Sequence, residues 1–155
     1  MENITKTIAL VAHDNRKQDL MEWVDYNYEK LIHNKLVCTG TTGRLVKETL
    51  EKNLQDDEII EQQMILLKSG PLGGDQQLGA MIAEEKIDML IFLWDPMEPQ
   101  PHDVDVKALL RIAVMYNVPT ANNRSTADFL ITSGLYMTDY KPILRDYSGY
   151  IMRKI

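Results

Sequence analysis

The sequence has a single cysteine, Cys38, so it cannot form an internal disulfide framework. A lone thiol is typical of a reducing compartment, and since nothing at the N-terminus resembles a signal peptide, we expect a cytoplasmic protein. Positive charge is also scarce, with 17 Lys and Arg against 23 Asp and Glu. The sequence therefore lacks the excess of basic residues that binding to nucleic acid or an anionic membrane requires. The longest apolar run, Met89 to Trp94, is far too short to span a bilayer. We therefore expect neither nucleic acid nor membrane as a partner.

The length of 155 residues favours a single domain, residues 1–155, with a substantial core. Short apolar runs alternate along it with segments of helical periodicity. The predicted strands are Ile4–Ala12, Lys35–Cys38, Met64–Leu67, Met89–Trp94 and Asn117–Ala121. The predicted helices run from Asp14 or Asn15, as N-cap, to about Ile32, through Leu45–Leu50, from Leu78 to about Lys86, through Val106–Ala113 and from Ser125 to about Ile131. This alternation predicts a doubly wound parallel α/β sheet covered on both faces.

Three features outside this pattern carry weaker expectations. Residues 51–63 form a long acidic connection that we interpret as surface elaboration. The tail from Tyr140 is expected to form a final short strand and helix. Trp23, Trp94 and the methionines are expected in the core, and His33 at the surface.

The turn Ser69-Gly70-Pro71-Leu72-Gly73-Gly74-Asp75 joins the apolar run Met64–Leu67, which we expect to be buried, to a helix. Its glycines let the backbone take φ > 0 and present bare N–H groups beside the positive end of the helix dipole, which favours phosphate. Asp75 is the odd residue, because a carboxylate is repelled by the ligand that such a turn attracts. A position that costs affinity suggests a chemical task, such as taking a proton.

Other unusual polar residues follow the remaining strands. His13, Asp14 and Lys17 follow the first, Thr39-Gly40-Thr41-Thr42-Gly43 follows the second, and Asp95 and His102 follow the fourth. Because ligands bind beyond the carboxyl ends of the strands in such sheets, we expect these residues to gather at one site. A phosphate cradle, a carboxylate and a histidine together suggest proton abstraction from a small phosphorylated carbonyl compound.

Each of these features also has a reading without a ligand. Either glycine turn alone is equally typical of a helix N-cap, Lys17 of a solvated helix face, and Asp95, Asp103 and Asp105 of loops and helix caps. A metal site made by His13, His102 and Asp95 is conceivable, but no pair of these residues has a familiar ligand spacing. The Thr/Gly turn lacks the lysine of a P-loop, so no nucleoside triphosphate is implied.

In this order, the motifs resemble those of the methylglyoxal synthase family, from Ile8 to about Tyr150. The segments that carry the resemblance are Ala12-His13-Asp14 with Lys17-Gln18, Thr39–Gly43, Ser69–Gly79, Phe92–Pro96 and Pro101–Arg111. The resemblance implies a flavodoxin-like, doubly wound five-stranded parallel sheet in a methylglyoxal synthase-like three-layer sandwich, usually a homohexamer. The acidic segment near residues 54 to 61 is longer than in the family, and Arg153 and Lys154 are candidates for its cationic residue near the C-terminus.

The function implied by the resemblance is a lyase that converts dihydroxyacetone phosphate to methylglyoxal and inorganic phosphate through an enediolate, in the methylglyoxal bypass of glycolysis. No metal or organic cofactor is implied, and inorganic phosphate is product and inhibitor. By the same carry-over, Asp75 is the base, His102 acts on the enediolate oxygens, and Asp14, Asp95 and Asp105 are supporting carboxylates. The residues implied to hold substrate are His13, Lys17, Thr39, Gly40, Thr41, Thr42, Ser69 and Gly70. The alternative is a non-catalytic regulatory domain that senses a phosphorylated small molecule, as in carbamoyl phosphate synthetase.

Overall fold

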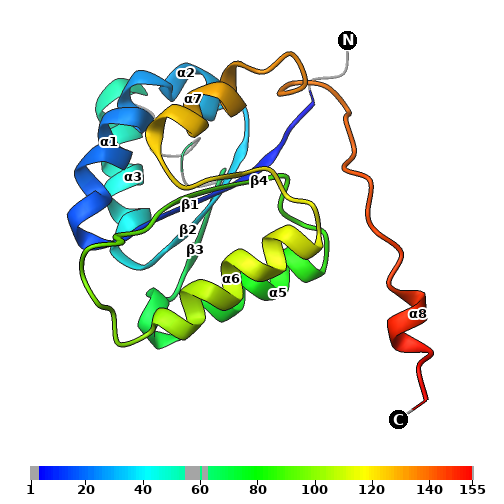
Figure 1. Cartoon of the computed structure of the whole chain (residues 1–155). Helices are drawn as coiled ribbons and strands as arrows, with labels where there is room; N and C mark the ends of the chain where they lie inside the picture. Colours follow the sequence, from blue (N-terminus) through cyan, green and yellow to red (C-terminus); the bar gives the residue numbers. More distant parts are fainter. Residues whose placement is uncertain (1–3, 55–59, 61–62, 155) are drawn as a thin grey trace.

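The computed structural model of the chain describes residues 4–54, 60 and 63–154, and its core is a five-stranded parallel sheet (Figure 1). The strands are β1 (Thr7–Ala12), β2 (Lys35–Thr39), β3 (Met64–Leu67), β4 (Met89–Leu93) and β5 (Thr120–Ala121), in the spatial order β3-β2-β1-β4-β5. In the register, Leu10 of β1 lies between Cys38 of β2 and Ile91 of β4. The predicted doubly wound parallel sheet is confirmed. Its central strand is β1, whereas the central strand of flavodoxin, which has the order 2-1-3-4-5, is the third.

Helices cover both faces of the sheet, which makes three layers (Figure 1). One face carries α1 (Lys17–Tyr26), α2 (Tyr28–Leu31), α3 (Gly40–Leu54) and α7 (Arg124–Thr132), and the other carries α5 (Gly74–Ala83) and α6 (Asp103–Met115). Successive residues of β1 therefore enter two separate cores: Leu10 packs with Trp23 on one side and Val11 with Phe92 on the other. Burial on both faces explains why this strand is apolar without alternation.

Two expectations about burial are wrong. The Met64–Leu67 run is the edge strand β3, with Ile65 and Leu66 exposed by 43% and 57%, because no further strand lies beyond it in the described sheet. Of the methionines expected in the core, Met97 and Met152 are 84% and 79% exposed. Trp23 is buried and His33 exposed, as expected.

The helix expected from Asp14 to about Ile32 is divided. It begins with the 3-10 turn η1 (Asp14–Arg16) and breaks at Asn27, where the backbone leaves the helical region. The carbonyl of Trp23 accepts from both the backbone N–H and the side-chain amide of Asn27 at this helix end. The expected capping is also wrong: Asp14 accepts from Lys17, and Asn15 donates to two carboxylates of another loop.

The tail from Tyr140 contains no strand among its described residues, 140–154, and its helix is the single turn α8 (Ser148–Ile151). Its side chains are largely exposed, and it runs along one side of the molecule (Figure 1). It touches the body where Asn117 donates to the carbonyl of Ile143 and the Tyr147 hydroxyl donates to the carbonyl of Met115. Of the acidic connection, α3 takes residues up to Leu54, and residues 55–59 and 61–62 lie outside the described residues.

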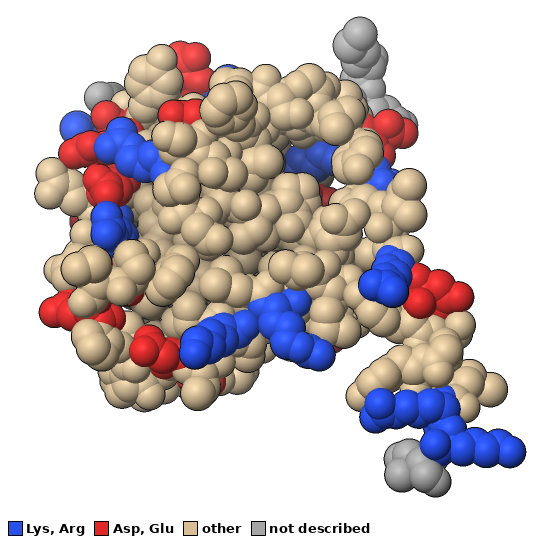
Figure 2. Space-filling model, viewed as in Figure 1, with Lys and Arg blue, Asp and Glu red and all other residues tan. Residues whose placement is uncertain are grey.

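On the face shown in Figure 2, Lys and Arg side chains are interspersed with Asp and Glu around the margin, and no continuous basic surface forms there. Within the described residues, no helix is both long and apolar enough to cross a membrane.

Candidate active site at the carboxyl ends of the strands

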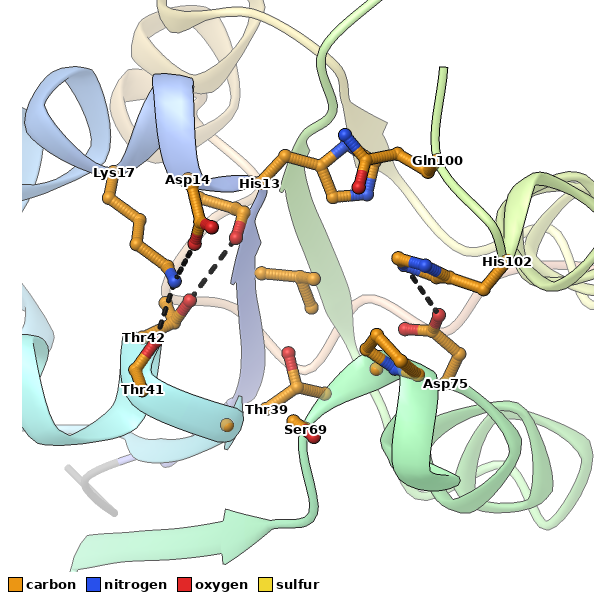
Figure 3. Close-up of a pocket in the computed structure, with 15 residues that line it drawn as sticks. His13, Asp14, Lys17, Thr39, Thr41, Thr42, Ser69, Asp75, Gln100 and His102 are labelled. Atoms are coloured by element: carbon orange, nitrogen blue, oxygen red, sulfur yellow. Dashed lines mark hydrogen bonds and ion pairs between the residues drawn. The ribbon is translucent and has the colours of Figure 1, made fainter. Parts of the chain in front are cut away.

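A cavity of about 250 Å³ opens where β1, β2 and β3 end and where the loop after β4 folds over them. It is lined by most of the residues that the sequence singled out: His13, Asp14, Lys17, Thr39, Gly40, Thr41, Thr42, Ser69, Gly70, Asp75 and His102. Lys17 and Asp75 lie on opposite sides of it (Figure 3). The expected convergence of four segments on one pocket is confirmed.

The turn before α5 has a backbone that only glycine fits. Its 3-10 turn η2 (Gly70–Leu72) ends at Gly73 in the left-handed region, φ +109°. A Cβ on the next residue, Gly74, would lie 1.9 Å from the carbonyl oxygen of Lys68, a distance that no side chain tolerates. This tight turn lets α5 begin at once and puts Asp75 in its first turn, at the edge of the cavity.

Asp75 is a desolvated carboxylate, with only 4% of its surface exposed. Burial raises its pKa, nearby Asp105 acts in the same direction, and His102 opposes the rise. Its Oδ2 lies 3.8 Å from Nε2 of His102, which stands directly before α6 and is itself 9% exposed (Figure 3). Neither Oδ2 of Asp75 nor Nδ1 of His102 has a hydrogen-bond partner among the described residues, although both are buried. Orphaned buried polar atoms beside a cavity are groups that a ligand can satisfy.

His13 lines the cavity with its ring nearly perpendicular to that of His102, the centroids 5.6 Å apart. Burial lowers the pKa of His13, and so does His102; Asp95, Asp103 and Asp14 partly offset the fall. The backbone N–H of Asp95 donates to Nδ1 of His13 at 2.9 Å. In the neutral ring the proton is then on Nε2, which is buried and has no partner among the described residues.

The opposite wall carries the positive charge. Nζ of Lys17 donates to Oγ1 of Thr41 and to Oδ1 of Asp14, each at 2.5 Å, and this lysine lowers the pKa of Asp14 (Figure 3). Thr41 and Thr42 lie in the first turn of α3, where backbone N–H groups have no partner within the helix. A cation, hydroxyl groups and a helix N-terminus together form an anion site.

Two predicted residues, Asp95 and Asp105, do not line the cavity as described. Asp95 contacts the cavity residue His13, because the backbone N–H of Asp95 donates to Nδ1 of that ring. Asp105 lies in a groove between α5 and α6 that also reaches Asp75. Of the two C-terminal candidates, Arg153 stacks on the Tyr150 ring, its guanidinium 3.9 Å from the centroid, and neither it nor Lys154 lines the cavity.

The sequence reasoning missed two polar residues, Gln100 and Asn15. Gln100 lines the cavity from the loop after β4 (Figure 3). Its position two residues before His102, in a loop expected at the carboxyl ends of the strands, could have marked it as a site residue. The sequence predicts only a helix cap at Asn15, whereas its side-chain amide bridges two carboxylates of that loop.

Among the described residues, no three His, Cys, Asp or Glu side chains are grouped as a metal site requires. His13, His102 and Asp95 therefore do not form the metal site considered as an alternative.

Comparison with known proteins gives one consistent result. Residues 19–122 match the family model described as the MGS-like domain. The chain is 56% identical over 153 residues to a methylglyoxal synthase of Maridesulfovibrio salexigens, covering 97% of this chain and 98% of that protein. It is 52% identical over 150 residues to a methylglyoxal synthase of Proteus mirabilis, covering 97% and 92%. The crystal structure of methylglyoxal synthase from Elizabethkingia anophelis NUHP1 superposes with a TM-score of 0.84 at 49% identity, covering 97% of this chain and 93% of that one.

Proposed function

The chain belongs to the methylglyoxal synthase family, and we propose that it converts dihydroxyacetone phosphate to methylglyoxal and inorganic phosphate. The observation that carries this proposal is the position of Asp75 and His102 opposite the wall of Lys17 and Thr41 in one small cavity. A triose phosphate held by its phosphate at that wall directs its carbonyl end toward the acid–base pair.

In the proposed first step, Asp75 takes a proton from the hydroxymethyl carbon next to the ketone. A carboxylate is a weak base in water, and the burial that raises the pKa of Asp75 makes it a stronger one here. The electron pair of the broken C–H bond forms a C=C bond, the π pair of the carbonyl moves onto the ketone oxygen, and an enediolate results. His102 and His13 border the same space, and their ring N–H groups are suited to stabilise the developing oxyanion.

In the second step, the enediolate expels phosphate. A proton first passes from the hydroxyl on the former hydroxymethyl carbon to the former ketone oxygen, and we assign this transfer to His102. The electron pair of the new oxyanion forms the aldehyde C=O, the C=C bond shifts to the carbon that carries the phosphate, and the C–O bond to phosphate breaks. The enol product, with its hydroxyl on the middle carbon, rearranges to methylglyoxal. Elimination requires that this C–O bond be turned toward the π system, whereas a bond held in the enediolate plane survives. We assign the control of that torsion to Lys17, Thr39, Gly40, Thr41, Thr42, Ser69 and Gly70. Their interactions with phosphate are expected to strengthen as its charge increases on departure.

We assign supporting roles to the three remaining carboxylates. Asp14 accepts a hydrogen bond from Lys17 and would orient it, Asp95 would orient His13, and Asp105 raises the pKa of Asp75. The reaction as written needs no metal or organic cofactor.

Four broader proposals accompany this function. The whole chain, residues 1–155, would act as one domain, which the pairing of all described strands in one sheet supports. The active form would be a homohexamer, and inorganic phosphate would inhibit by occupying the wall that binds the substrate phosphate. The protein would work in the cytoplasm, in the methylglyoxal bypass of glycolysis, where its buried thiol Cys38 stays reduced.

The test is to incubate the pure protein with dihydroxyacetone phosphate and to follow inorganic phosphate and a trapped dicarbonyl together. We expect equal amounts of both. Phosphate binding without release of either product would overturn the proposal and favour the alternative, a regulatory domain, which needs the cradle but gives no role to Asp75 beside His102.

A further inference from the structure

Asn15 links the two loops that contribute His13 and His102 to the cavity. It belongs to η1, directly after β1, and its Nδ2 donates to Oδ2 of Asp95 at 3.0 Å and to Oε2 of Glu98 at 2.6 Å. Both acceptors lie in the long loop that joins β4 to α6 and carries Gln100 and His102. The exposed pair with Glu98 contributes little energy by itself, whereas Asp95 is buried and its carboxylate needs partners.

The Asp95 carboxylate has few other anchors. Its Oδ1 accepts from the backbone N–H of Met97 at 2.9 Å, and Arg16 approaches no closer than 3.9 Å. Asn15 therefore supplies the only short contact from another element to this carboxylate among the described residues.

The backbone of Asp95 in turn acts on His13. Its N–H donates to Nδ1 at 2.9 Å, so Nδ1 must keep its lone pair and the ring proton must be on Nε2. Nε2 is buried without a partner among the described residues and borders the cavity. A ring of the other tautomer would present a lone pair to the substrate oxygens instead of an N–H group.

We propose that Asn15 is a positioning residue: by holding Asp95 in place, it fixes His13 as the Nε2–H tautomer that donates a hydrogen bond to the bound substrate. The identity of that acceptor as an oxygen of a triose phosphate rests on the proposed function. The fixing of the tautomer does not, because it follows from contacts within the chain.

The charged groups that face His13 come from three elements. They are the carboxylates of Asp14 in η1, Asp95 in the loop after β4 and Asp103 in the first turn of α6, together with the titratable ring of His102 directly before α6. Loss of the Asp95 N–H would free Nδ1 to take a proton while the three carboxylates remain. Removal of Asn15 is therefore expected to raise the pKa of His13.

The direct test is ¹⁵N-histidine NMR of the folded protein without substrate, which reads the protonation of each ring nitrogen. The chain has three histidines, so His13→Gln identifies the signal. In the unsubstituted protein at neutral pH we expect a lone-pair Nδ1 and a protonated Nε2. In Asn15→Ala we expect mixed tautomers, a raised His13 pKa, and kcat/KM lower by about 10- to 100-fold. Asn15→Asp, which keeps the shape but puts a third carboxylate beside two others, should lose more.

Asn53→Ala is the matched control. The Asn53 amide likewise bridges two acceptors, Oδ1 of Asp25 and the carbonyl of Thr49, but far from the cavity. Its kcat/KM should stay within about twofold and its His13 signal unchanged. Because Asn15 is exposed, its replacement should leave the fold intact, and circular dichroism verifies this. The proposal is overturned if Asn15→Ala keeps the His13 tautomer and pKa, or if its kcat/KM stays within twofold. If the unsubstituted protein does not turn over dihydroxyacetone phosphate, the proposed function fails, while the NMR result still decides the tautomer.

Discussion

Nε2 of His102 lies 3.8 Å from Oδ2 of Asp75, although the two residues stand at the starts of different helices that pack side by side. The distance is too long for a hydrogen bond and short enough that one substrate atom can contact both side chains. Each group is also at the positive end of a helix dipole, which stabilises negative charge formed between them. This relationship fits the roles proposed above, proton removal for Asp75 and charge stabilisation for His102.

Asp75→Asn removes the proposed base while keeping the size of the side chain. We expect turnover to fall by roughly 10²–10⁴ or more, because an amide cannot accept the proton. Phosphate affinity should change little, since Lys17 and Thr41 on the opposite wall are untouched. Steady-state kinetics and phosphate inhibition measure the two effects, with Asp25→Asn, a remote surface carboxylate, as control. Near-normal turnover in the Asp75 variant would reject this residue as the base.

Lys17→Ala should act mainly on substrate binding. A hydrogen bond from a charged group contributes about 1.5–3 kcal/mol, so we expect KM to rise by about 10- to 100-fold while kcat falls much less. Lys52→Ala, at the exposed end of α3, removes the same charge away from the cavity and should leave KM unchanged. A saturation curve of Lys17→Ala that overlays the unsubstituted one would contradict a phosphate role.

Gly70→Ala tests how closely the backbone must approach the carboxylate of Asp75. A Cβ at Gly70 would lie 3.0 Å from Oδ2 and 3.2 Å from Oδ1 of Asp75, so the carboxylate has to move. We expect turnover to fall by about 10- to 100-fold from this displacement. At Gly79, within α5, the nearest atom to an added Cβ is 4.0 Å away, so Gly79→Ala should keep its activity and gain helix stability. Equal activity in both variants would show that the approach of Gly70 is not required.

Much of this site could be predicted because local sequence and topology point to the same edge of the sheet. Three strand-to-helix turns can be recognised locally, by the glycines at 73 and 74, by a lysine one helical turn beyond His13 and by the histidine before α6. Parallel strands bring such turns together at one edge of the sheet. The edge position of β3 could not be predicted, because its four apolar residues look the same whether a further strand covers them or not.

The contacts of Asn15 could not be predicted either, because its partners are distant in the sequence. Its partners, Asp95 and Glu98, are 80 and 83 residues away, and an asparagine just after a strand is a good helix cap by local rules. Only the fold of the loop after β4 decides between a cap and a bridge. The same loop brings Asp95 to His13, a contact that sequence spacing does not indicate.

The raised pKa of Asp75 also predicts an effect on stability, with a sign opposite to that of most carboxylates. Because its pKa is higher in the folded state than in the unfolded one, the folded state binds more protons between the two values. The contribution of Asp75 to the free energy of unfolding is therefore fully present below the unfolded pKa and is lost as the pH rises through the folded pKa. At any pH above the unfolded pKa, burial of this side chain therefore lowers stability.

Asp75→Asn, which cannot ionise, should accordingly raise the melting temperature by a few degrees at neutral pH, and the gain should vanish in acid, where Asp75 is protonated in both states. Asp14→Asn supplies the opposite sign: its hydrogen bond from Lys17 lowers the pKa of Asp14, so replacement should cost a little stability at neutral pH and nothing in acid. Thermal melts of the three proteins at equal concentration between about pH 2 and pH 8, a range that extends below the unfolded pKa of an aspartate, measure both trends. A difference in melting temperature that does not change with pH would mean that Asp75→Asn acts through packing. That result would contradict the claim that burial raises the pKa of Asp75 and so makes it a stronger base.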